Sequence, residues 1–129
     1  AQMVAVLGQQ VATSRPNNEE TFFTRYSLKK RPYLGPTSTD HELAIMMANK
    51  VKLVKVILYT IILGTGSIAC ALQHFNAFVF GSDLDIRVIK GYGVGRKTKN
   101  DIKDLDKIDK FDITTNFKYL GLPEPDFWV

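Results

Sequence analysis

The sequence has little of what crosslinks small proteins or binds metal ions. Its 129 residues include one cysteine, Cys70, and two histidines, His41 and His74. A lone cysteine excludes a disulfide within the chain, and these three residues are too few for a structural zinc site. Because disulfide-free chains are typical of reducing compartments, and the first ten residues lack the pattern of a signal peptide, we expect a cytoplasmic protein.

Long uncharged apolar stretches are also scarce, and the longest is residues 56–72. A membrane-spanning helix needs about 20 predominantly apolar residues, whereas this run is shorter and contains Gly64 and Gly66. Its first part is mostly β-branched or aromatic, as in a strand buried on both faces, and residues 67–75 suit a helix. A strand, a glycine turn and a helix are therefore predicted, with a single-span membrane subunit as the alternative.

The sequence has no strong excess of either charge sign, since 17 Lys and Arg against 13 Asp and Glu give a net charge of only +4. With 45% apolar and 23% charged residues, the composition suits one globular domain. One purely basic segment near the N-terminus carries Arg25, Lys29, Lys30 and Arg31. These side chains predict a contact with an RNA phosphate backbone, and a solvated linker is the alternative.

Local patterns predict an alternation of helices and strands. Thr39 and Glu42 match a capping box that would start a helix over 40–50, whose Met46 and Met47 would lie in the core against a sheet. Residues 96–110 mix both charge signs, as in a solvated helix or long loop. The other expected elements are strands over 56–62 and 77–81 and helices over 67–75, 86–89 and 113–120. Two strands joined through a helix form a parallel βαβ unit.

The glycine turn between the first strand and its helix is the strongest functional signal. Gly64 and Gly66 would let a ligand approach the backbone N–H groups at the start of a helix. Asp83 follows Gly64 by nineteen residues, at the end of the second strand, where a carboxylate can accept hydrogen bonds from both hydroxyls of a ribose. Asp85 is the neighbouring candidate. A nucleoside cofactor is predicted, and because Gly64-x-Gly66-x-x-Ala69 fits a relaxed dinucleotide fingerprint, NAD remains a rival to S-adenosylmethionine.

An ordered series of sequence blocks carries a family resemblance. These blocks are Tyr26–Asp40, Met46–Asn49, Gly64–Ser67, His74–Ala77 and Gly81–Asp85. In this order they resemble the eukaryotic tRNA guanosine-10 methyltransferases, which carry an N-terminal THUMP RNA-binding region. The resemblance implies methyl transfer from S-adenosylmethionine to the exocyclic amine of a guanine in tRNA, and a small zinc-binding activator subunit as partner.

The resemblance also implies a fold and a domain organisation. Residues 1–24 would be a linker or the exit from a preceding domain. Residues 25–129 would form the N-terminal half of an α/β, Rossmann-like class I methyltransferase domain. The chain ends before the family's block of Asp or Asn followed by Pro-Pro-Tyr, so these 129 residues are expected to be inactive by themselves.

Site residues follow from the same resemblance. Asp83 would hold the cofactor ribose, Thr37 and Ser38 would border its methionine end, and the segment with Asn116 would approach the adenine. The predicted cofactor set is Thr37, Ser38, Gly64, Thr65, Gly66, Asp83 and Asn116. One departure matters: Thr60-Ile61-Ile62 stands where the family has Asp-Pro-Phe, so the carboxylate expected near the methionine ammonium is missing. A degenerate, non-catalytic scaffold is therefore the alternative to an enzyme.

Overall fold

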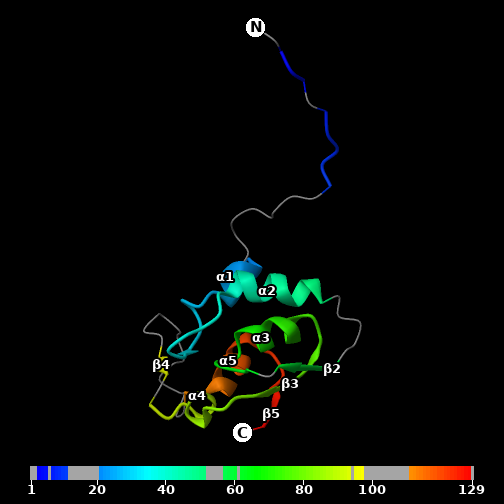
Figure 1. Ribbon diagram of the computed structural model, residues 1–129. Helices are drawn as coiled ribbons and strands as arrows, with labels where there is room; N and C mark the ends of the chain where they lie inside the picture. The colour runs from blue at the N-terminus through cyan, green and yellow to red at the C-terminus, as the bar shows by residue number, and fades with distance from the viewer. Residues whose placement is uncertain are drawn as a thin grey trace.

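The computed structural model describes residues 3–5, 7–11, 21–51, 57–60, 62–93, 95–97 and 111–128 (Figure 1). The mixed-charge segment predicted over 96–110 lies outside these residues except at its first two positions, and so does most of the polar part of the predicted linker. Near the N-terminus, Met3 and Leu7 are almost fully exposed.

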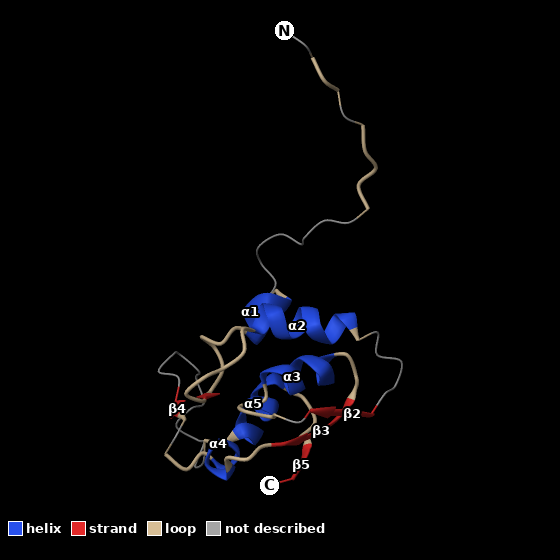
Figure 2. Cartoon of the chain, viewed as in Figure 1, coloured by secondary structure: helices blue, strands red, loops and turns tan. Residues whose placement is uncertain are grey.

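A three-stranded parallel sheet lies along one edge of the fold, beside the helices (Figure 2). Its strands are β2 (Ile57–Thr60), β3 (Phe78–Ser82) and β5 (Asp126–Trp128), and their order is β2-β3-β5. Helix α3 (Ser67–His74) connects β2 to β3, whose register pairs Ile57 with Phe78. The predicted strand, turn, helix and strand are confirmed. The third strand was not predicted.

Helix α2 (His41–Lys50) confirms the predicted helix but not its cap. Asp40 is the N-cap, and its carboxylate accepts hydrogen bonds from the N–H groups of Glu42 and Leu43 at 3.0 and 3.2 Å. The capping box predicted at Thr39 is therefore wrong by one residue, because the carboxylate of Asp40 reaches the first-turn N–H groups instead.

The packing of α2 also differs from the prediction. The helix packs on α3 rather than on the sheet, through a face that includes Ala44 and Ala48. Small side chains on this face allow a close approach of the two helices. Met46 and Met47 lie on other faces and are 57% and 44% exposed, so their assignment to the core is wrong.

Glycines in the left-handed conformation end the two remaining predicted helices. Helix α4 (Ile86–Lys90) ends at Gly91 with φ +73°, and α5 (Ile113–Leu120) ends at Gly121 with φ +67°. Both ends agree with the predicted boundaries to within one residue. The short helix α1 (Phe22–Tyr26) begins within the predicted linker. Two further short elements, β1 (Tyr33–Leu34) and β4 (Arg96–Lys97), pair antiparallel. None of these three elements was predicted.

The core lies between α2, α3, α5 and the sheet, and Cys70, Ile113 and Phe117 are fully buried in it. Within the described ranges, every helix is too short or too polar to cross a membrane. The apolar run that suggested a span contains instead strand β2, the glycine turn and most of α3, so the structure favours the strand-turn-helix prediction over the membrane alternative.

Candidate functional site

The turn between β2 and α3 holds two glycines for different physical reasons. Gly64 has φ +53°, and a Cβ atom built on it meets no atom within 4 Å, so the space beside its backbone is open. Gly66 has φ +82°, and its Cβ would lie 3.0 Å from the Phe117 ring. Gly64 therefore leaves room for a ligand, whereas Gly66 allows the turn to pack on α5.

Asp83 lies directly beside this turn. Its Oδ2 accepts a hydrogen bond from the Gly64 N–H at 2.8 Å, and its Oδ1 accepts one from the Asp85 N–H at 2.9 Å. The structure thus brings together the two groups that the sequence separates by nineteen residues. Because an ionised carboxylate has about four acceptor positions, Asp83 retains capacity for the hydroxyls of a ribose.

The neighbouring candidate, Asp85, has a different role. It is the N-cap of α4, accepting the Arg87 N–H at 3.0 Å, and it pairs with the Arg87 guanidinium at 2.9 Å. The hydrogen bond from the Arg87 side chain lowers the pKa of this exposed carboxyl. Asp83, and not Asp85, contacts the glycine turn.

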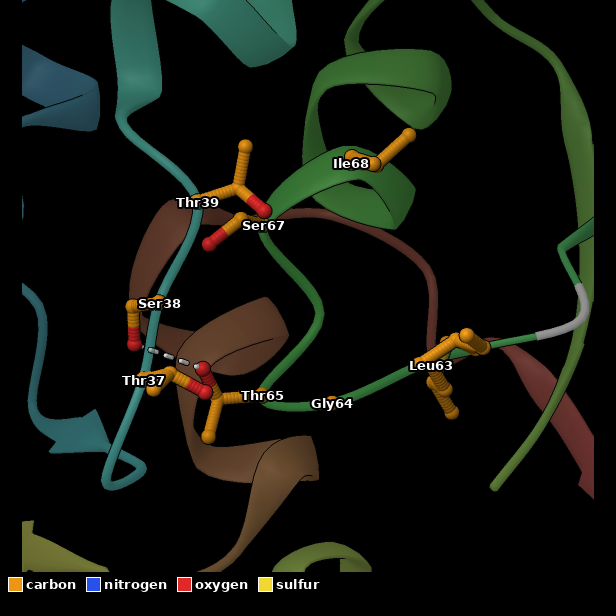
Figure 3. A pocket seen from close by; sticks show the side chains of 9 residues that line it. Thr37, Ser38, Thr39, Leu63, Gly64, Thr65, Ser67 and Ile68 are labelled. Atoms are coloured by element: carbon orange, nitrogen blue, oxygen red, sulfur yellow. Dashed lines mark hydrogen bonds between the residues drawn. The ribbon is translucent and has the colours of Figure 1, made fainter. Parts of the chain in front are cut away.

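A pocket of about 310 Å³ opens beside the turn (Figure 3). The hydroxyls of Thr37 and Ser38 face it from the segment before α2, and Ser38 Oγ lies 3.1 Å from Thr65 Oγ1. Its volume is at the lower end of the range for small-molecule sites. We call it the glycine-turn pocket, and it is lined by uncharged residues: Thr37, Ser38, Thr39, Ile62, Leu63, Gly64, Thr65, Ser67 and Ile68. The lining residues that were not predicted as site residues are Thr39, Ile62, Leu63, Ser67 and Ile68.

The positive electrostatic potential near this pocket comes from two groups, the N-terminus of α3 and the buried Arg31. The N-cap of α3 is Gly66, which has no side chain to cap the helix, so within the described residues the first-turn N–H groups keep their partial positive charge. The buried Arg31 donates a hydrogen bond from Nη1 to Ser67 Oγ, at the first residue of that helix. Burial lowers the pKa of Arg31, yet a guanidinium stays charged at neutral pH. The helix terminus and the cation together favour an anionic group near Ser67.

The buried side chain of Asn116 holds the glycine turn in place through hydrogen bonds. Its side chain is fully buried, with Nδ2 donating to the carbonyls of Tyr33 and Thr65 at 2.8 and 3.1 Å. Its Oδ1 accepts the Tyr33 N–H at 2.9 Å. The resemblance had placed Asn116 in a segment that approaches the adenine. Here its amide holds the segment of Tyr33 against the turn, which makes it a positioning residue.

The four predicted RNA-binding residues lie in different environments. Arg25 and Lys29 are exposed and Lys30 is partly buried, and Arg25 Nη2 donates to the Leu120 carbonyl at 2.6 Å. Arg31 is only 3% exposed, because its guanidinium is taken up by Ser67 and the core. The prediction of a surface contact with RNA is therefore wrong for Arg31. Within the described segments, no group of three His, Cys, Asp or Glu side chains could hold a metal ion.

Comparison with known proteins finds similar sequences but no similar structure. The chain is 42% identical over 87 residues to tRNA (guanine(10)-N(2))-methyltransferase of Saccharomyces cerevisiae, covering 67% of this chain and 19% of that protein. It is 35% identical over 98 residues to the Bos taurus tRNA (guanine(10)-N(2))-methyltransferase TRMT11, covering 75% and 20%. For the Homo sapiens protein of the same name, the identity is 38% over 79 residues, covering 60% and 17%. No family model and no solved structure matches the chain.

Proposed function

We propose, because the chain is homologous to part of the tRNA (guanine(10)-N(2))-methyltransferases, that it forms the cofactor-binding part of an S-adenosylmethionine-dependent tRNA guanosine methyltransferase. The chain spans about a fifth of the length of these relatives. In this proposal residues 25–129 are the N-terminal half of a Rossmann-like methyltransferase domain, and residues 1–24 lead into it.

The contact between the Gly64 N–H and Asp83 carries this proposal. It joins an open glycine turn, an uncapped helix N-terminus and a carboxylate at the ends of two adjacent parallel strands. Ligands of open α/β sheets bind at the carboxyl ends of the strands. Asp83 would hold the ribose hydroxyls, and the backbone of Gly64 to Gly66 would lie under the nucleoside. The bound cofactor would supply an electrophilic methyl group.

The methionine end of the cofactor would lie in the glycine-turn pocket. Its carboxylate suits the N-terminus of α3, where Arg31 adds positive charge behind Ser67. The hydroxyls of Thr37 and Ser38 would receive its ammonium group, since the pocket lining contains no carboxylate. A lost charged contact is worth about 1.5 to 3 kcal/mol, so we expect an affinity about one to two decades below that of a site with the carboxylate.

The substrate and partners follow from the homology. The exocyclic amine of a guanine in tRNA would be the methyl acceptor. The exposed Arg25 and Lys29, with Lys30, would contact its phosphates. A small zinc-binding activator subunit would be the protein partner, and the cytoplasm the location.

A non-catalytic scaffold with the same fold is the second candidate function. The uncharged lining of the glycine-turn pocket favours it, because a site that has lost cofactor binding has no need of a partner for the ammonium. A third candidate, a dinucleotide-dependent reductase, is supported only by the spacing of the glycines.

Isothermal titration with S-adenosylmethionine distinguishes these candidates. We expect binding to the 129-residue chain, and at least tenfold weaker binding to Asp83→Asn, because the variant loses the charge that holds the ribose. Asp85→Asn is the matched control: it lies two residues away, asparagine caps helices as well as aspartate does, and binding should not change. No heat of binding with the wild-type chain would leave the scaffold candidate, and tighter binding of NAD than of S-adenosylmethionine would support the reductase.

A further inference from the structure

A second cavity, with a volume of about 530 Å³, lies at the other end of strand β3 from the glycine turn. We call it the α5 cavity, because the end of α5 contributes to its wall together with the ends of α1 and α3 and the start of β3. The large apolar side chain exposed there is that of Phe78, at 71%. A single exposed apolar side chain is ordinary on a protein surface, whereas a group of them on one face indicates an interaction site. Helix α2 carries such a group.

The face of α2 that points away from the fold is apolar. Figure 1 shows α2 at the outside, with α3 beneath it. Leu43, Met46 and Met47 are 48%, 57% and 44% exposed. Val51, at the end of the helix, is 48% exposed. These residues lie at i, i+3, i+4 and i+8, on the side opposite the residues that are buried against α3. A helix that is apolar on both sides is normally buried, so the outward face of α2 indicates a partner.

Opposite charges lie at the two ends of this apolar face. Glu42 is in the first turn of α2 and Lys50 is in the last turn, and both are exposed. Among the described residues neither side chain forms an ion pair. The outward face is therefore negative at its start, apolar in the middle and positive at its end. The same face on an antiparallel helix presents the complementary order.

We propose that α2 forms the interface of a homodimer, in which its outward face packs antiparallel on the same face of a second copy of the chain. A two-fold axis between Met46 and Met47 brings Met46 of each copy against Met47 of the other. Glu42 of each copy then lies at the level of Lys50 and Val51 of the other copy, which gives two symmetric ion pairs. Methionine side chains adapt to irregular apolar surfaces, and the two helix dipoles are opposed.

The charges favour a second copy over two other occupants of this face. An RNA strand needs a basic surface, whereas this face carries an anion as well as a cation, with apolar residues between them. The N-terminal segment, where Met3 and Leu7 are exposed, has no charged side chain before Arg15 and would leave Glu42 and Lys50 without partners. Because a helix of ten residues is about 15 Å long, the interface is small and the dimer should depend on concentration.

The test is sedimentation velocity of the 129-residue chain between about 5 and 500 μM, where a small interface should shift the wild type from monomer towards dimer. Met47→Glu should weaken association at least about tenfold, because it places two carboxylates near the two-fold axis. Phe78→Glu is the matched control. Phe78 is more exposed than Met47 but lies at the α5 cavity, so this variant should associate as the wild type does.

An exchange of charges tests the antiparallel arrangement itself. Glu42→Lys and Lys50→Glu should each weaken association about fivefold, because each replaces two attractive pairs by two repulsive ones. The double variant Glu42→Lys/Lys50→Glu should recover the wild-type affinity to within about twofold. A general contact between apolar faces predicts no such recovery. Circular dichroism shows whether each variant retains its helices.

Four results would overturn the proposal. The wild type could stay monomeric up to about 500 μM. Association could be lost in Phe78→Glu but kept in Met47→Glu, which would move the contact to the α5 cavity. The double charge variant could associate as weakly as the single ones, which would contradict antiparallel pairing. Association could be lost on deletion of residues 1–11, which would make the N-terminal segment the occupant. None of the substituted residues lines the glycine-turn pocket, so failure here leaves the proposed function untouched.

Discussion

The glycine-turn pocket and the α5 cavity lie at opposite ends of strand β3, and each depends on a buried amide side chain. Asn116, behind the turn, makes three hydrogen bonds with Tyr33 and Thr65. Gln73, in the cavity wall, has an Oε1 that makes none among the described residues. The first amide completes a fixed backbone surface, whereas the second leaves a shielded acceptor without a partner among the described residues. The hydrogen bonds of Asn116 therefore give it a structural role, whereas Oε1 of Gln73 contributes no hydrogen bond to the fold.

The largest expected effect is that of Asn116→Leu. The substitution leaves the Tyr33 N–H and the carbonyls of Tyr33 and Thr65 buried without partners, so we expect a loss of about 3 kcal/mol or more in the free energy of unfolding. Urea denaturation measures it. The control is Asn49→Ala on the exposed side of α2, which should change stability by no more than about 0.5 kcal/mol. A similarly small effect for Asn116→Leu would contradict the structural role assigned to Asn116.

The two glycines of the turn sharpen the account of the first pocket. Gly66→Ala adds left-handed strain and a contact with Phe117, so we expect a loss of about 2 to 4 kcal/mol in stability. Gly64→Ala adds strain without a clash, about 1 to 2 kcal/mol, but its methyl group projects into the open space beside the turn. Thermal denaturation and titration with S-adenosylmethionine together should show that Gly64→Ala loses more affinity than its stability change explains. Unchanged affinity in that variant would place the ligand elsewhere.

His74 should make the free energy of unfolding depend on pH. Burial, with a smaller effect from Arg25, lowers the pKa of His74 in the folded chain. The unfolded chain therefore takes up the proton first. The stabilising contribution is complete above the ordinary histidine pKa of about 6.5 and is lost as the pH falls through the folded-state pKa. Urea denaturation between pH 7.5 and pH 5 should show this decline in the wild type and a smaller one in His74→Gln. Identical dependence of stability on pH in the wild type and in His74→Gln would contradict this role of His74.

Gln73→Leu should have the smallest effect on stability, which completes the comparison of the two amides. Removing a buried acceptor that has no partner does not break a bond to Oε1, so we expect stability within about 0.5 kcal/mol of the wild type or slightly higher. The measurement is the same urea titration used for Asn116→Leu. A loss close to that of Asn116→Leu would show that Gln73 is satisfied within the protein.

Local signals predicted the glycine-turn pocket but could not predict the α5 cavity. The turn, the helix that follows it and Asp83 are short-range features whose separation is set by one βαβ unit, and glycine stops marked the ends of α4 and α5. The cavity wall joins residues from Arg25 to Glu124, which no spacing connects. Strand β5 was missed because it has three residues and pairs with distant β3.

Burial of charged and sulfur-containing side chains was the other failure of prediction. A run of four basic residues gives no sign that one of them, Arg31, turns inward to Ser67. Likewise, Met46 and Met47 follow a helical apolar pattern, yet α2 packs through alanines. In both cases the neighbour that decides the environment, α3, lies far away in the sequence.

A nuclear magnetic resonance titration with S-adenosylmethionine tests most directly whether the glycine turn and Asp83 form one nucleoside site. The account predicts that the backbone amide signals of residues 64–67 and of Asp83 shift together, while those of Gln73 and Phe78 stay unchanged. Signals that shift at Gln73 and Phe78 but not at the glycine turn, or a saturating ligand concentration that moves neither set, would contradict it.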